Sequence, residues 1–133
     1  PVSVRAPSPF FLSAGQIFRI VRTETEHGGP FTVRPTGYFY SIEVPDEREL
    51  FAFHWTPEET RPGTVTTPHM HVGSVLLGQQ QLIRPGSLHK AHIPTGPLSL
   101  AAVVRFAIAE LGVIPLRSNW RTVLDRAEGA FTA

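Results

Sequence analysis

Two histidines separated by a single residue occupy the segment TTPHMHVG, residues 66–73. An unperturbed imidazole titrates at about pH 6.5, so near neutral pH one ring can accept a proton while another donates one. Ring nitrogens also bind transition metals, and an H-x-H pair on a strand is a common partial metal site. His69 and His71 therefore indicate one of three roles: acid–base catalysis, metal binding, or structural hydrogen bonding.

Two further histidines lie on the same face as this pair if the surrounding segments are strands. Side chains alternate between the two faces of a strand, so His69 and His71 share one face. In LFAFHWTP, residues 50–57, the aromatic residues at 51, 53 and 55 share a face that excludes His54. In KAHIP, residues 90–94, the same alternation places His92 opposite Ile93. If helices cover the aromatic face, four imidazoles converge on the open face of the sheet and form the candidate catalytic set: His54, His69, His71 and His92.

The remaining pattern predicts the elements that hold this set. Alternation predicts further strands in residues 15–26, 37–45 and 69–77, the second with Tyr38 and Tyr40 on one face. Apolar residues at helical spacing predict a helix in residues 99–112, with Ser99 as its N-cap, and a shorter helix that Ser118 caps. We therefore expect an α+β fold, in which an antiparallel β-sheet carries two C-terminal α-helices packed on one face.

Composition limits the class of protein. The 133 residues have the size of one domain, which we place at residues 15–133 after a flexible N-terminal arm, residues 1–14. With no cysteine, the chain has neither a disulfide framework nor a thiolate ligand. No apolar run approaches the ~20 residues that cross a bilayer, and the start of the chain does not resemble a signal peptide. The expectation is a cytoplasmic protein without a membrane partner.

Charge is distributed unevenly along the chain, although its net value is only +1. No Asp or Glu occurs between Glu59 and Glu110, and the same interval contains most of the histidines. A locally cationic segment favours an anionic partner such as phosphate or RNA, and Arg84 and Lys90 are the candidate phosphate-binding residues.

A metal site is the alternative use of the histidines. Cupins combine G-x5-H-x-H with a following Glu and a second motif, P-x-G-x2-H. The interval from Gly63 to His71 satisfies the first half and RPGSLH, residues 84–89, approximates the second, but the Glu is missing. The two expected helices also fit a cupin poorly. We therefore expect no cofactor, with His69, His71 and His89 as the ligands if a metal is bound.

The segments TTPHMHVG and HIPTGPLSLAAVVRFAIAELG give the chain a resemblance to the TumE-like toxins of prokaryotic toxin–antitoxin pairs. The resemblance covers roughly residues 36–112 in element order. It points to His69, His71 and Gly73, with His54 in FHW as a looser match. It implies a compact α+β domain and an antitoxin protein as partner.

The sequence thus favours a toxin-like, metal-independent endoribonuclease that cleaves RNA with His69 and His71 as base and acid. Two alternatives stay open: a non-catalytic module that binds a ligand or partner through GYFYSIEV, residues 37–44, and a cupin-like metalloprotein. RNA, an antitoxin and a second copy of the chain are the partners considered.

Overall fold

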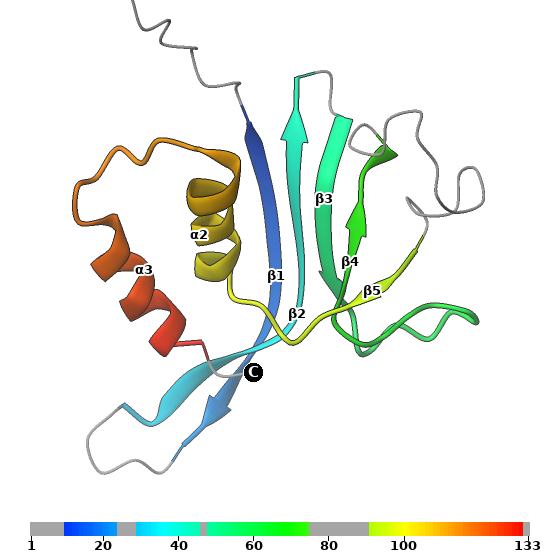
Figure 1. Ribbon diagram of the computed structural model, residues 1–133. Coiled ribbons are helices and arrows are strands. Elements are labelled where there is room, and N and C mark those ends of the chain that lie inside the picture. Colours follow the sequence, from blue (N-terminus) through cyan, green and yellow to red (C-terminus); the bar gives the residue numbers. More distant parts are fainter. Residues whose placement is uncertain (1–9, 24–28, 46–47, 75–90, 132–133) are drawn as a thin grey trace, which may run out of the picture.

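The computed structural model of the chain describes residues 10–23, 29–45, 48–74 and 91–131 (Figure 1). Five strands form one sheet in the order β1-β2-β3-β4-β5, and every neighbouring pair is antiparallel. The elements are β1 (Phe11–Arg22), β2 (Phe31–Val44), β3 (Arg48–Trp55), β4 (His69–Val72), β5 (Ile93–Pro94), α2 (Leu100–Leu111) and α3 (Trp120–Gly129). The expected α+β fold, with its antiparallel sheet and two C-terminal helices, is confirmed.

The first strand begins at Phe11, four residues before the expected start, so residues 11–14 are not part of a flexible arm. The cause is pairing with β2, because Leu12 lies opposite Ile42 and Ala14 opposite Tyr40. Residues 1–9 of the expected arm lie outside the described residues. Of the other expected strands, β4 ends at Val72, and β5 consists of only two residues.

The hydrophobic core lies between the sheet and α2. Tyr38, Tyr40 and Ile42 of β2 are almost completely buried, at 1%, 0% and 1% exposure. From α2, the ring of Phe106 meets Phe51 of β3 edge-on at a centroid distance of 5.2 Å. Helix packing on the aromatic face is therefore confirmed, and it leaves His54 on the other face.

Burial of the two tyrosines weakens one alternative. The binding module was based on exposed aromatic residues in GYFYSIEV, but Tyr38 and Tyr40 stack on each other within the core at a centroid distance of 4.7 Å, and of its aromatic residues only Phe39, at 43%, is exposed. The Tyr38 hydroxyl accepts a hydrogen bond from the backbone N–H of Leu98 at 3.0 Å, which ties β2 to the segment that leads into α2. These tyrosines belong to the core and lie on the opposite face from the histidines.

Helix α2 begins and ends where the sequence predicts. The hydroxyl of Ser99 accepts a hydrogen bond from the N–H of Ala102 at 3.0 Å. Gly112 ends the helix in the left-handed conformation, with a φ of 72°, which glycine adopts without a Cβ clash. The N-cap of α3 is Asn119 and not the predicted Ser118, and its side chain makes no capping hydrogen bond.

Ion pairs join α3 to α2. The Arg105 guanidinium on α2 donates to the carboxylates of Asp125 and Glu128 at 2.7 Å each. Across the described residues, neither helix is long and apolar enough to span a membrane.

Candidate histidine site

Strand pairing places the predicted histidines on one face of the sheet, as expected. His54 of β3 lies directly opposite His69 of β4, and Ala52 lies opposite His71. Met70 pairs with Ile93 of β5, so His92, one residue before Ile93, falls on the histidine face. The alternation derived from the sequence therefore brings together residues that are 38 positions apart along the chain.

The four rings form one cluster, which we call the histidine cluster: His54, His69, His71 and His92. The ring centroids of His69 and His71 are 5.2 Å apart, and His54 lies 5.4 Å from His69 and 5.1 Å from His71. His92 completes the cluster at 4.9 Å from His69 and 4.6 Å from His71. All five pairs are tilted or edge-on, so ring nitrogens can converge without face-to-face stacking.

Exposure differs sharply within the histidine cluster. His69 is buried at 4% exposure, His54 and His71 are partly buried, and His92 is exposed. The expected open face is therefore partly closed, since His92 is the only exposed member of the cluster.

The surroundings of His69 and His54 indicate which of their ring nitrogens can bind a ligand. Nδ1 of His69 lies 2.7 Å from the carbonyl oxygen of Thr67. A carbonyl can only accept, so Nδ1 carries the hydrogen, and in the neutral form of the ring the lone pair is on Nε2. Nε2 of His54 is buried and has no hydrogen-bond partner among the described residues. A buried polar atom without a partner costs on the order of 1–3 kcal/mol, so a group that contacts this nitrogen would restore that loss.

Burial and repulsion from neighbouring rings keep His54 and His71 uncharged. The pKa of His54 is lowered to about 4, first by burial and then by the neighbouring imidazoles of His71, His69 and His92 in that order. The pKa of His71 is also lowered, first by burial and then by His92 and His69. At neutral pH both rings are therefore neutral and have lone pairs to offer.

Three of the rings are arranged as a ligand set. His54, His69 and His71 each present one ring nitrogen, and these nitrogens all lie within 4.8 Å of one another. Tetrahedral zinc, with Zn–N bonds of about 2.0–2.1 Å, would need nitrogens roughly 3.4 Å apart, so a small inward rotation of the side chains completes the geometry. In the described part of the chain, no carboxylate joins this group.

Three sequence-predicted site residues lie outside the described residues: Arg84, His89 and Lys90. The alternative ligand set with His89 is therefore untested, whereas His54, which that set omitted, lies next to His69 and His71. The cupin-like alternative does not fit the fold, because cupins are double-sheet jelly rolls and these five strands form one sheet with helices on a face.

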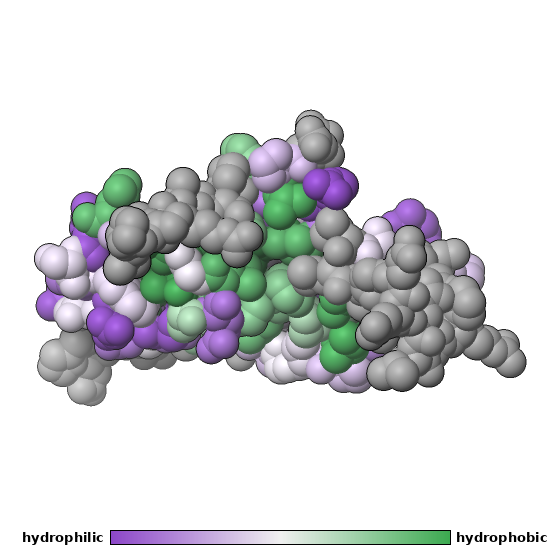
Figure 2. Space-filling model, turned by 45° about the horizontal axis from the view of Figure 1, so that its top comes forward, coloured by the Kyte–Doolittle hydropathy of each residue, from purple (hydrophilic) through white to green (hydrophobic). Residues whose placement is uncertain are grey.

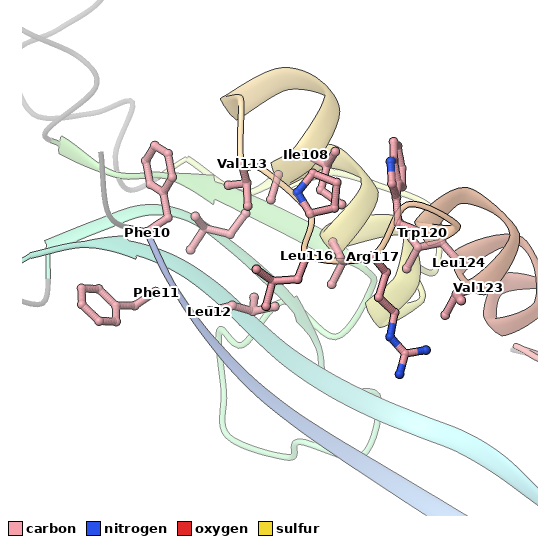
Figure 3. A pocket seen from close by; sticks show the side chains of 14 residues that line it. Phe10, Phe11, Leu12, Ile108, Val113, Leu116, Arg117, Trp120, Val123 and Leu124 are labelled. Carbon is pink, nitrogen blue, oxygen red and sulfur yellow. The ribbon is translucent and has the colours of Figure 1, made fainter. Parts of the chain in front are cut away.

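A second feature, which the sequence analysis missed, is an apolar groove between the helices and β1. Its volume is about 360 Å³, and Leu12, Ile108 and Trp120 are among its lining side chains (Figure 3). Apolar surface gathers in the middle of the face shown in Figure 2. The available signal was the segment GVIPLRSNW, residues 112–120, where Leu116 is fully exposed. The groove lies on the helix side of the sheet and shares no residue with the histidine cluster.

Comparisons with protein families, with curated proteins and with solved structures found no match to this chain. The interpretation of the site therefore depends on its own geometry.

Proposed function

We propose that the histidine cluster binds a transition-metal ion through ring nitrogens of His54, His69 and His71, and that the bound ion serves hydrolytic chemistry. Imidazole suits zinc, copper, nickel and iron. Neutral rings are the form that binds metal, and the lowered pKa values of His54 and His71 keep them neutral at physiological pH.

The observation that carries the proposal is the hydrogen bond from Nδ1 of His69 to the carbonyl of Thr67. Metal-binding histidines almost always donate their second ring N–H to a carbonyl, a carboxylate or water, which fixes the tautomer and orients the ring. His69 already has this arrangement. The unpartnered Nε2 of His54 adds a second nitrogen that a metal ion would satisfy.

A metal site with three histidine ligands suits a catalytic metal ion better than a structural one. Structural zinc sites close all four positions with protein ligands, whereas catalytic sites keep one position for water or substrate. A zinc ion lowers the pKa of its bound water to about 7, which supplies hydroxide at neutral pH. His92 is exposed and its ring centroid lies 4.6 Å from that of His71, so it could exchange protons with a substrate bound at the cluster.

Metal titration tests the proposal directly. We expect the purified chain, stripped with chelator, to bind one Zn²⁺ or Co²⁺ per chain in calorimetry, and Co²⁺ to give the visible absorption of a tetrahedral site. His54→Gln should weaken binding by at least 100-fold, while His92→Gln, outside the proposed ligand set, should weaken it less than 10-fold. Absence of stoichiometric binding, or unchanged binding by His54→Gln, would refute a metal site.

A metal-independent ribonuclease is the second candidate, favoured by the His71–His92 pair. These rings are the closest in the cluster and the nearest to solvent. A neutral His71 could remove the 2′-OH proton of RNA while a second imidazole protonates the leaving 5′-oxygen. The resemblance to TumE-like toxins supports RNA as the first substrate to test and an antitoxin as partner.

One assay separates the two candidates. The chain is incubated with mixed RNA, with and without chelator, and the 3′ ends are analysed. Metal-independent cleavage leaves a 2′,3′-cyclic phosphate, spares DNA and survives chelator, and His71→Ala should reduce it by on the order of 10²–10⁴. Cleavage that is lost in chelator and restored by zinc supports the metal site. RNA that stays intact under both conditions removes the ribonuclease candidate.

A further inference from the structure

Strand β1 is exposed along most of its length. It is an edge of the sheet, with β2 as its neighbour, and every residue from Phe11 to Ile20 is exposed. Long exposed edge strands with apolar side chains pair readily with other strands, and proteins commonly protect them with prolines or inward-pointing charges. The large apolar side chains of β1 are 44–67% exposed: Phe11, Leu12, Ile17, Phe18 and Ile20.

The far end of β1 and the start of β2 form a two-stranded extension, residues 18–22 and 31–35, which we call the outer ribbon. It projects beyond the rest of the sheet (Figure 1). Phe18 and Ile20 lie on the same face as Gln16, whose amide donates to the core hydroxyl of Tyr40. Their partners across the ribbon include Val33, opposite Ile20. The outer ribbon thus continues the apolar, helix-covered face of the sheet, but its large side chains are more than half exposed.

A two-stranded ribbon is at best marginally stable in water without a covered apolar face. We propose that a second copy of this chain pairs with this edge, with the β1 strands of the two copies antiparallel about a two-fold axis at Gln16, so that each outer ribbon becomes part of a wider sheet. The two five-stranded sheets then form one continuous sheet of ten strands.

The sequence of β1 is complementary to itself in this register. Residues on opposite strands whose numbers add to 32 face each other and lie on the same side of the sheet. Phe11 then meets Val21, and Leu12 meets Ile20, so apolar side chains pair. The pairs that complete the register combine a small residue with a large one: Ser13 with Arg19, Ala14 with Phe18, and Gly15 with Ile17. No like charges oppose each other.

The apolar side chains of β1 supply area that strand pairing can bury. A fully buried aromatic side chain covers about 150–250 Å², so half-exposed Phe11 and Phe18 each have roughly 100 Å² left to bury, about 400 Å² for the two copies together. Leu12, Ile17, Ile20 and the backbone of the paired strands add to this area, toward the roughly 1,000 Å² of a specific interface. In this register Ile20 of one copy lies beside Leu12 of the other. Leu12 is one of the residues that line the apolar groove.

A cysteine at the axis gives the sharpest test, because the chain has none of its own. Directly opposed residues on antiparallel strands have Cα atoms about 4.5–5.5 Å apart, within disulfide range. Gln16→Cys should therefore cross-link to a dimer under mild oxidation. Ile20→Cys is the matched control, since its two copies lie about 26 Å apart and should not cross-link. The double variant Ser13→Cys, Arg19→Cys should also cross-link between copies, and it leaves the Gln16 hydrogen bond intact.

Light scattering measures the assembly itself. We expect twice the chain mass of 14.7 kDa for the wild type. Ile20→Lys should dissociate the dimer, while Ile114→Lys, at a similar exposure of 69% against 67% but outside β1, should leave it intact. A monomeric wild type at about 100 μM would overturn the proposal, as would a dimer in which Ile20→Cys cross-links and neither Gln16→Cys nor the double variant does.

Discussion

Replacing His54 by leucine tests whether burial keeps this ring neutral. The folded pKa of His54 is about 4, against about 6.5 for an unperturbed imidazole. Between these two values the unfolded chain binds a proton that the folded chain does not, so the unfolding free energy falls as pH falls from about 6.5 to about 4. The full difference corresponds to roughly 3 kcal/mol, a large fraction of the 5–15 kcal/mol that is typical of domains.

Urea unfolding of the metal-free protein, followed by tryptophan fluorescence, measures this quantity. The wild type should lose about 3 kcal/mol more than His54→Leu when the pH is lowered from about 7 to about 4. His92→Gln is the control, because the exposed ring of His92 is not buried by folding, and its pH dependence should resemble that of the wild type. Equal pH dependence of the wild type and His54→Leu would show that His54 is not kept neutral by burial.

Other substitutions test the fold around the cluster. Gly73→Ala should destabilise the chain by at least 1–3 kcal/mol, because a Cβ there would lie 1.7 Å from the backbone oxygen of Glu49; Gly96→Ala, with open space around it, should be nearly neutral in the same urea assay. Ser99→Ala should cost about 1 kcal/mol through loss of the α2 cap, and an unchanged midpoint would contradict that role. Tyr38→Phe should cost about 1–3 kcal/mol by leaving a buried N–H unpaired, with faster hydrogen exchange at the start of α2 as its second sign.

The sequence predicted the histidine cluster because strand periodicity is a local property. Once His54 and His69 were placed on strands, alternation alone decided which face each ring occupies, and the register of β3 and β4 then made them neighbours. The N-cap of α2 was predictable for the same reason, since Ser99 bonds to a backbone group three residues away.

Features that depend on distant partners were not predictable in this way. Tyr38 and Tyr40 could be assigned to one face, but which face the helices cover was decided by packing against α2. The start of β1 was placed too late, because residues 11–14 gain their strand character from pairing with β2. The hydrogen bond of His69 to Thr67 and the burial of His54 depend on atomic positions that periodicity does not contain.

His54 also distinguishes the two proposed chemistries. With a pKa of about 4 it is a poor proton donor at neutral pH, and its Nε2 is buried, so it has no direct role in metal-free RNA cleavage by the pair His71 and His92. In a metal site the same properties are an advantage, because a neutral, desolvated imidazole binds a cation without first releasing a proton.

His54→Leu should therefore abolish zinc binding and any zinc-dependent hydrolysis but leave metal-free cleavage within about 10-fold of the wild type. His71→Ala should lower both activities, since His71 is a ligand in one mechanism and the base in the other. Loss of metal-free cleavage in folded His54→Leu would contradict this separation.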